Sequence, residues 1–362
     1  MTNQQPVDAA DSWRRMVEAL RMAGERMDAG TRILSADERA DGFRALARAL
    51  ANQIGRLEVD DAHPELDPFN LWRHKFYMDN PDFLYWVGEI SDEGSYHIKG
   101  RAPGAAFLSI NVYSGAGLVA RTVARVTSDD LDLKEDGSFS VSFGKSPAGE
   151  GSLHMPLPQG ANMIWVRQFY EEPPTGEAYT RIVRLDKAPT PPFIEASRFA
   201  RRLDRMGMVL DEASKRIAGG ARLATEGSNQ IRVWVEAQGG AVYTEPGIYY
   251  HSGGWDLRSG QALLIEGRMA PARFMNIMLY SRFHNSLDYN NRQISLTGKS
   301  IKTDSDGRFR LVLAGEDPGC ANWLDTEARP QGMFLIRWLQ PEVTPDLPTV
   351  RMVPISEIGK DA

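Results

Sequence analysis

The sequence predicts a mainly β protein built from two related antiparallel β-sandwich, jelly-roll-like units, each preceded by amphipathic helices. Three observations lead to this fold class. Short runs of alternating apolar and polar residues, separated by Gly, Pro, Asn and Asp, are typical of antiparallel strands. Apolar residues at three- and four-residue steps indicate a helix before each set of strands. An internal repeat relates the two sets of strands to each other.

Residues 1–60 are expected to be helical. The first helix has one apolar stripe, which consists of Trp13, Met16, Val17, Leu20, Ala23 and Met27. Ser35 and Glu38 form a capping-box pattern that opens a second helix, and Gly55 is its expected end. The apolar face of this second helix consists of Phe43, Leu46, Ala47, Leu50 and Ile54.

Residues 61–190 are expected to form the first sandwich. The runs 107–113 and 138–143 alternate between apolar and polar residues, as strands with one buried face do. A linker follows, marked by Pro189, Pro191 and Pro192. Residues 191–222 are expected to hold a linker helix that Gly219–Gly220 ends, and residues 223–362 the second sandwich. The face of the linker helix consists of Phe199, Leu203, Met206, Leu210, Ala213 and Ile217.

The internal repeat is the most informative feature. Residues 100–114 match residues 267–281 without gaps, at an offset of 167 (267 − 100). Upstream, Pro81, Tyr85 and Gly88 match residues 246, 250 and 253 at an offset of 165 (246 − 81). Downstream, residues 136–139 and 166–169 match residues 306–309 and 336–339 at an offset of 170 (306 − 136). A helix followed by a sandwich is therefore used twice, and matched sandwiches usually pack about a pseudo-two-fold axis with a cleft between them.

Positions that both copies share are best explained by the fold. Arg167 and Arg337 are shared, and each lies in an apolar strand, where it is expected to pair with a carboxylate or to cap backbone carbonyls. Gly100 and Gly267, together with the two Asp-Gly pairs, are expected to be turn positions. Residues found in only one copy are the better functional candidates.

Composition and missing motifs exclude several classes of function. The net charge of −6 without a strongly basic stretch argues against nucleic acid as a partner. The single cysteine, Cys320, excludes a disulfide within the chain and a cysteine-based metal site. The absence of an apolar leader or membrane span predicts a cytoplasmic protein with no membrane partner, and a homo-oligomer is left open. No dinucleotide, nucleoside-triphosphate or zinc motif occurs, so we expect no cofactor and no metal.

Candidate catalytic residues lie in the second copy, which has the more polar loops. Residues 282–292 include His284, Asp288, Tyr289 and Arg292, whereas the corresponding first-copy stretch, residues 115–121, is small and apolar. On the first interpretation, these side chains are expected to supply a general base, its orienting carboxylate, an acid and an anion clamp. The alternative is a solvated loop that folds through its Asn and Asp side chains.

Two further positions are candidates. His251 stands where the first copy has Trp86, and it is either a catalytic base or a core histidine. Trp255 and the pair Asn322–Trp323 are candidate substrate-binding residues, in which the two rings form walls of the site. For the pair, the alternative is that it closes the end of a sandwich.

The pair Asn322–Trp323, followed by the apolar-Arg-aromatic strand of residues 332–338, resembles the C-terminal motif of bacterial proteins with domain of unknown function 1214. Residues 291–295 are similar to an upstream motif of this family, and residues 80–85 and 96–100 to the front part of its shorter members. The resemblance covers roughly residues 67–353 and implies two all-β domains with helical additions. It implies no activity. The first copy departs from the pattern, because residues 152–153 are Ser-Leu where members often repeat Asn-Trp.

The sequence does not determine which reaction, if any, the protein performs. The first hypothesis is an enzyme without a redox cofactor, a lyase, isomerase or hydrolase that acts on a hydrophobic or aromatic small molecule. Here His251 or His284 is the base, and Arg292 and Asn322 fix the substrate. The second hypothesis is a carbohydrate-active or carbohydrate-binding sandwich, because exposed Trp rings stack on sugars. The third is a non-catalytic scaffold.

Overall fold

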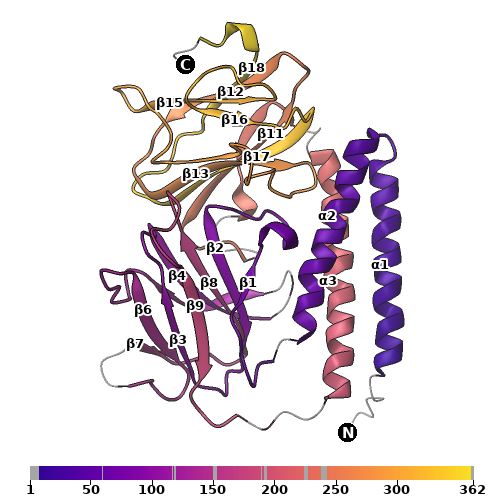
Figure 1. Ribbon diagram of the computed structural model, residues 1–362, viewed down its shortest axis with the longest axis vertical. Coiled ribbons are helices and arrows are strands. Elements are labelled where there is room, and N and C mark those ends of the chain that lie inside the picture. Colours follow the sequence, from indigo (N-terminus) through magenta and orange to yellow (C-terminus); the bar gives the residue numbers. More distant parts are fainter. Residues whose placement is uncertain are drawn as a thin grey trace.

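The computed structural model describes residues 8–58, 60–115, 117, 120–149, 153–188, 190, 194–223, 227–237 and 243–359. Over these residues the protein is mainly β, as the sequence predicts, with four sheets arranged as two sandwiches and with three α-helices. Figure 1 shows the second sandwich stacked on the first, and the helices along one side of both. The predicted linker prolines Pro189, Pro191 and Pro192 lie outside the described residues.

The first sandwich is formed by β1 (Asp67–Phe69), β2 (Phe83–Glu89), β3 (Tyr96–Arg101), β4 (Phe107–Ser114), β5 (Arg121–Thr127), β6 (Ser138–Phe143), β7 (Leu153–Met155), β8 (Ala161–Phe169) and β9 (Tyr179–Arg184). Its five-stranded sheet has the order β1-β2-β8-β4-β5, and its four-stranded sheet the order β7-β6-β3-β9. The two predicted strands at residues 107–113 and 138–143 are confirmed as β4 and β6.

The second sandwich is formed by β10 (Gln230–Val233), β11 (Ile248–Asp256), β12 (Gln261–Arg268), β13 (Ala272–Ser281), β14 (Ser295–Thr297), β15 (Arg308–Ala314), β16 (Trp323–Asp325), β17 (Gln331–Pro341) and β18 (Thr349–Pro354). Its sheets have the orders β10-β11-β17-β13-β14 and β16-β15-β12-β18. Strand for strand, these are the orders of the first sandwich, so the repeat in the sequence is a repeat in the topology. The pairs β6–β7 and β15–β16 are parallel, and all other strand pairs described are antiparallel.

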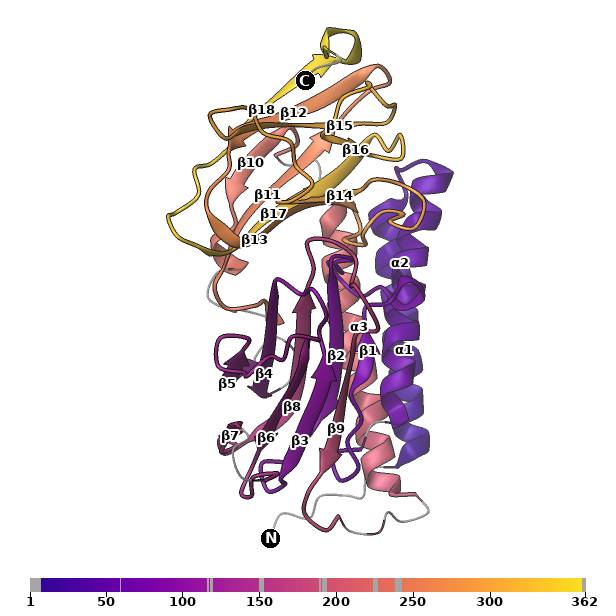
Figure 2. The same cartoon turned by 60° about the vertical axis from the view of Figure 1, so that its left-hand side comes forward.

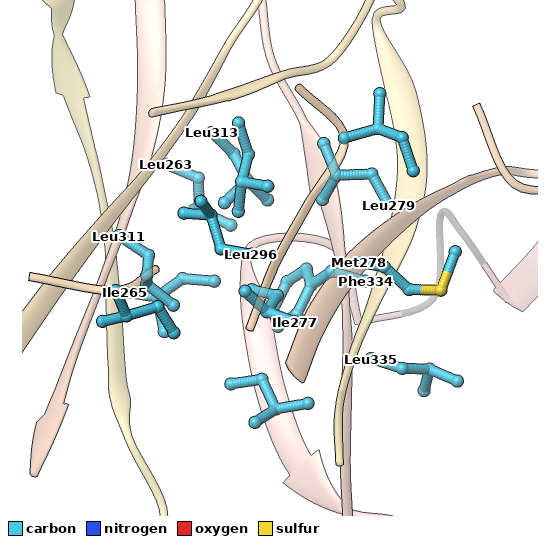
Figure 3. Packing of buried hydrophobic residues seen from close by; sticks show 14 of the residues in the cluster. Leu263, Ile265, Ile277, Met278, Leu279, Leu296, Leu311, Leu313, Phe334 and Leu335 are labelled. Carbon is cyan, nitrogen blue, oxygen red and sulfur yellow. The ribbon is translucent and has the colours of Figure 1, made fainter. Parts of the chain in front are cut away.

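The alternation of apolar residues explains how each sandwich buries its core. In the second sandwich, side chains at every second position of β12 and β15 meet those of β13 and β17, as Figure 3 shows. The facing residues include Leu263, Ile265, Leu311, Leu313, Ile277, Leu279 and Phe334. Successive strand side chains point to opposite faces, so the same strands leave a second set of residues for the outer faces of the sandwich.

The helices α1 (Ala9–Thr31), α2 (Ala36–Ile54) and α3 (Ala196–Leu223) pack against one another, although α3 comes between the two sandwiches in the sequence. Figure 2 shows the three lying side by side. Ser35 is confirmed as the N-cap of α2, because its Oγ accepts from the Glu38 amide at 3.3 Å, and Gly55 caps the end of α2.

Three details of the helices differ from the sequence prediction. Phe43 and Ile54 of the predicted face of α2 are exposed, at 37% and 50%. Trp13 and Val17 of the predicted stripe are exposed, because α1 is the outermost helix and buries a narrow face of Ser12, Met16, Ala23, Met27 and Thr31. The helix α3 does not end at Gly219–Gly220 but continues to Leu223. A glycine weakens a helix interior without forbidding it.

The shared glycines divide into two groups. Gly137 and Gly307 of the Asp-Gly pairs have φ angles of +79° and +74° and lie in turns, as predicted. Gly100 and Gly267 were predicted as turn positions, and this is wrong, because they lie inside β3 and β12. A phenylalanine ring from the neighbouring strand covers each of them, and a Cβ at Gly100 would lie 2.5 Å from Cζ of Phe139. The two glycines are conserved between the copies because they leave room for these rings.

The five-stranded sheets of the two sandwiches face each other, and the expected cleft between them is filled. Phe83, Phe107 and Phe169 of the first sandwich pack on Phe274 and Leu339 of the second, in one buried cluster. The rings of Phe83 and Phe169 lie 4.1 Å apart, and those of Phe169 and Phe274 lie 5.8 Å apart. The sandwiches are therefore joined by an aromatic core, and the open cavity described below lies elsewhere.

Candidate functional site

A cavity of about 340 Å³ lies where α2, the short 3₁₀ helix η2 (Trp72–His74) with the following Lys75, and two loops of the second sandwich meet. Polar and charged side chains dominate its wall. The lining residues are Asp41, Arg44, Arg48, Trp72, Lys75, Ser281, Asn285, Ser286, Leu287, Asp288, Arg292, Glu327 and Arg329. Five of these are cationic and three are acidic. We call this cavity the loop pocket.

The helix α2 supplies one wall of the loop pocket. Asp41, Arg44 and Arg48 follow each other at steps of three and four residues, which places them on one face of the helix. The helix is held against the second sandwich by Phe283, whose ring packs into the helical core next to Gly42. The wall is therefore fixed by the packing of helices on the second sandwich.

Lys75 lies at the floor of the loop pocket and is 1% exposed. Its ammonium donates to the backbone carbonyls of Ser286 at 2.7 Å and Leu287 at 3.0 Å. The same nitrogen lies 4.2 Å from the ring centre of Trp72 and 4.6 Å from that of Tyr289. Burial lowers the pKa of Lys75 to about 8. An ammonium has three donors, so one remains for a group in the pocket.

Arg48, like Lys75, lines the loop pocket without forming an ion pair with a carboxylate of the described residues. Its guanidinium lies 5.7 Å from the ring centre of Trp72, and its closest hydrogen-bond acceptor is Asn285 Oδ1 at 3.5 Å. Burial, followed by the nearby charge of Arg44, lowers its pKa. Among the described residues, no carboxylate oxygen lies within 4.0 Å of the charged nitrogens of Arg48 or Lys75.

The other three cations of the loop pocket are each paired with a carboxylate. Asp41 pairs with Arg44 and, at 2.8 Å, with Arg329, and Arg329 donates to Glu327 at 2.7 Å. Arg292, whose side chain is 46% exposed, pairs with Asp325 at 2.7 Å. The cations that remain for a ligand are therefore Arg48 and Lys75.

The predicted loop of the second copy forms the opposite wall. Asp79, from the segment before β2, accepts from the Ser286 amide at 2.9 Å and from its hydroxyl at 2.5 Å, which fixes the loop. Asp288 and Arg292 line the loop pocket, and Tyr289 contacts Lys75. Burial raises the pKa of Tyr289 to about 12. Three predicted site residues are thus brought together here.

The two predicted histidines are buried and lie apart from this wall. His284 is 2% exposed, and its ring lies 4.9 Å from that of Tyr77, between ring centres, with the two planes tilted by 38°. Its neighbours Ser281 and Asn285 line the pocket. Both of its ring nitrogens lack a hydrogen-bond partner among the described residues. His251 is fully buried in β11, and its Nδ1 accepts from Nε1 of Trp338 at 3.4 Å.

The remaining predicted residues make structural contacts. Trp255 is fully buried in the core of the second sandwich and donates to the carbonyl of Arg329 at 3.1 Å. Asn322 is 3% exposed, and its amide group bonds to both the amide and the carbonyl of Lys302 at 2.8 Å. Trp323 donates to the carbonyl of Ala314 at 3.1 Å and packs on the outer face of the four-stranded sheet. None of the three lines the loop pocket.

Sequence reasoning did not find Arg48, Trp72 and Lys75. The repeat singles out the polar loops of the second copy, whereas these residues come from α2 and from the segment between β1 and β2 of the first sandwich. One signal was present in the sequence, namely the arginines at positions 44 and 48 and the basic, aromatic run of residues 72–75. No group of three His, Cys, Asp or Glu side chains gathers as a metal site within the described ranges.

No described helix is both long enough and apolar enough to span a membrane. A crystal structure of an uncharacterized protein from Burkholderia cenocepacia superposes with a TM-score of 0.87 and 24% identity, over 96% of this chain and 98% of that one. A Vibrio parahaemolyticus protein gives a TM-score of 0.49 and 11% identity, over 91% of this chain and 100% of its own. No curated protein matches the sequence. The first similarity supports the fold.

One family model matches part of the chain. The family is described as "Protein of unknown function (DUF1214)", and the match spans residues 252–343. These residues lie in the second sandwich and include the loop that carries Asp288, Tyr289 and Arg292. The family resemblance predicted from the Asn-Trp motif and the following strand is confirmed for this copy. Residues 252–343 of the chain are a DUF1214 domain.

Proposed function

We propose that the protein binds a small molecule with an anionic group in the loop pocket. One observation carries the proposal: Arg48 and Lys75 both face the cavity, and neither has a carboxylate within 4.0 Å among the described residues. A partly buried cation without a counterion is costly, and a ligand carboxylate or phosphate relieves that cost. The rings of Trp72 and Tyr289 beside Lys75 suit a ligand that also has an aromatic or planar part.

The pocket changes the expected ligand. The sequence hypothesis favours a hydrophobic or aromatic molecule, but charged and polar groups line most of the cavity. An aromatic part therefore accounts for only one side of the ligand. We further propose that Arg48 and Lys75 take the role of anion clamp that the sequence hypothesis gave to Arg292, because Arg292 is already paired with Asp325.

Binding of two simple anions tests this proposal. Benzoate offers a ring for Trp72 and a carboxylate for the cations, and inorganic phosphate offers charge alone. Replacing Arg48→Gln or Lys75→Met is expected to weaken binding of benzoate about 10- to 100-fold in isothermal titration calorimetry, because a charge-assisted hydrogen bond is lost. Arg310→Gln, on an arginine paired with Glu266 outside the pocket, is the control and is expected to bind as the wild type does.

Two results would count against the proposal. The first is wild-type protein that binds neither benzoate nor phosphate. The second is binding that is unchanged in both Arg48→Gln and Lys75→Met.

An enzyme without a redox cofactor, a lyase, isomerase or hydrolase, is the second candidate function. The observation that favours it is Lys75, a buried amine in the loop pocket whose pKa of about 8 lies near the pH at which proton transfer is most effective. Lys75 then takes the place of His251 or His284 as the base. The same cavity serves both proposals, since a substrate with an anionic group must first bind there.

The lowered pKa of Lys75 can be measured by competitive acetylation with acetic anhydride, followed by peptide mass mapping. We expect the reaction of Lys75 to reach half of its maximal rate near pH 8, well below the exposed Lys299, whose pKa an ion pair with Glu172 raises. A half-point near 10.5 for Lys75 would remove the case for proton transfer.

The carbohydrate and scaffold hypotheses have less support than binding of an anionic ligand. A carbohydrate site at Trp323 loses support, because that ring packs on the sheet and donates to a carbonyl. A scaffold role competes with ligand binding and is discarded if benzoate or phosphate binds as expected. The single cysteine supports a cytoplasmic location. A homo-oligomer, and the absence of nucleic acid and membrane partners, stay predictions.

A further inference from the structure

The repeat places matched arginines and tyrosines at the junction of the two sandwiches. Tyr113 and Arg167 of the first copy correspond to Tyr280 and Arg337 of the second, at the offsets of 167 (280 − 113) and 170 (337 − 167). Each arginine bonds to the tyrosine of its own copy, at 3.3 Å in the first and 2.6 Å in the second. Both arginines are buried, and their charges act on the same phenol, that of Tyr85.

In the first copy, the charge of Arg167 is neutralised. Its Nη1 donates to Glu245 at 3.4 Å and its Nη2 to the carbonyl of Tyr243 at 2.5 Å. Glu245 is 2% exposed and also accepts from Ser109 at 2.7 Å, Asn111 at 2.7 Å and Arg125 at 2.7 Å. A carboxylate from the second sandwich thus completes the arginine site of the first.

In the second copy, the same position lacks a carboxylate. The repeat aligns Glu245 with Asn80, at the offset of 165 (245 − 80). Asn80 lies against Asn276, which aligns with Ser109, and accepts from its side-chain amide at 3.3 Å. Asn80 therefore occupies, beside the second sandwich, the position that Glu245 occupies beside the first. Its side-chain amide stands where Glu245 has a carboxylate.

Arg337 is left with an unsatisfied donor. It is 4% exposed, and its Nη1 has no partner among the described residues. The nearby carboxyl of Asp82 is held by Asn276 at 2.7 Å and Ser295 at 3.2 Å, and lies more than 4.0 Å from the guanidinium nitrogens. Nδ2 of Asn80 and Oδ1 of Asn276 also lack a partner in this part of the chain. The Asn276 oxygen carries no charge and does not neutralise Arg337, so the two buried donors still favour an acceptor with negative charge.

We propose that Arg337 binds a small oxyanion, a carboxylate or phosphate, in the place that corresponds to the Glu245 carboxylate beside Arg167. Arg337 Nη1 and Asn80 Nδ2 are its donors, and the Tyr280 hydroxyl orients the guanidinium. The phenol of Tyr85 also lies near Arg337. This oxyanion site is separate from the loop pocket, and neither Arg337 nor Asn80 lines that cavity.

Two variants distinguish loss of the oxyanion site from loss of folding. Arg337→Met removes the charge and keeps the apolar stem. Asn80→Glu supplies the carboxylate that the second copy lacks, as Glu245 does for the first. In the Arg48→Gln background, where the loop pocket is weakened, both are expected to abolish the response to the anion, but Asn80→Glu is expected to fold with a Tm at or above that of its parent in anion-free buffer, so a folding defect cannot imitate the result.

The measurement is the Tm of the full chain against inorganic phosphate and, separately, acetate, at constant ionic strength set with chloride. Arg48→Gln, in which the loop pocket is weakened, is expected to gain roughly 2 °C at tenfold the dissociation constant of the oxyanion site. Arg48→Gln combined with Arg337→Met or with Asn80→Glu is expected to gain none. An equal gain in all three proteins, or no gain in Arg48→Gln with either anion, would overturn the oxyanion site. Failure of benzoate to bind the loop pocket would leave these expectations unchanged.

Discussion

Acidification from pH 6.5 to pH 4 is expected to cost roughly 3 kcal/mol of folding free energy for each of two histidines, His251 and His284. Burial lowers the pKa of His251 to about 4, and burial together with the charge of Arg216 lowers that of His284 to about 4. In the unfolded chain both titrate near 6.5. Between pH 4 and pH 6.5, the unfolded state therefore binds more protons than the folded state. The free energy of unfolding falls as the pH falls through this window, and the contribution of the two histidines is fully lost below pH 4.

Variants isolate this effect from the carboxylates that also titrate in acid. His251→Gln keeps an acceptor for Trp338, and His284→Asn suits the positive φ of 60° at that position. Urea unfolding of each variant at pH 7, 5.5 and 4 is expected to show a smaller loss than the wild type, by roughly 3 kcal/mol at pH 4. His63→Gln, on an exposed histidine, is expected to follow the wild type. Parallel pH profiles for all four proteins would mean that neither buried histidine is held neutral.

Replacing Phe169→Ala is expected to destabilise the protein by about 3–5 kcal/mol, the cost of truncating a fully buried aromatic side chain. The Phe169 ring contacts Phe83 and Phe107 of its own sandwich, with centres 4.1 Å and 5.3 Å away, and Phe274 of the other. The cavity left by this change lies between rigid sheets that cannot close it. Urea unfolding followed by tryptophan fluorescence measures the loss.

The same variant tests whether the sandwiches unfold together. With the aromatic core intact, we expect one cooperative transition, and after Phe169→Ala a broader or two-step transition, because the contact between the two units is weakened. Val183→Ala, on a side chain that is 61% exposed, is the control and is expected to change stability by less than about 0.5 kcal/mol. A loss below about 1 kcal/mol for Phe169→Ala would show that the junction contributes little.

Periodicity and the repeat were sufficient to predict the sandwiches. In a strand with one buried face, apolar and polar residues alternate, whichever strands it pairs with. The exact match of strand orders in the two copies follows from the same residues. The contents of the junction could not be predicted in this way. Phe107 and Phe274 are matched apolar residues in the sequence, and only their packing in three dimensions shows that they close the expected cleft.

The candidate site was predicted in part for a similar reason. Asp288, Tyr289 and Arg292 stood out as polar residues in one copy, and they do gather at the loop pocket. Lys75 did not stand out, because its importance comes from burial under Trp72, which is a tertiary property without a local pattern. His251 could not be assigned from its aromatic neighbours, which are equally typical of a core and of an active site.

The most direct measurement of the central proposal is anomalous diffraction from crystals of the wild-type protein soaked in sodium iodide. Iodide reports sites for anions without assuming the natural ligand. We predict an anomalous peak in the loop pocket within hydrogen-bond distance of the Arg48 guanidinium and the Lys75 ammonium, and its loss in crystals of Arg48→Gln. Peaks at exposed arginines with none between Arg48 and Lys75 would contradict the proposal that the loop pocket binds an anionic ligand.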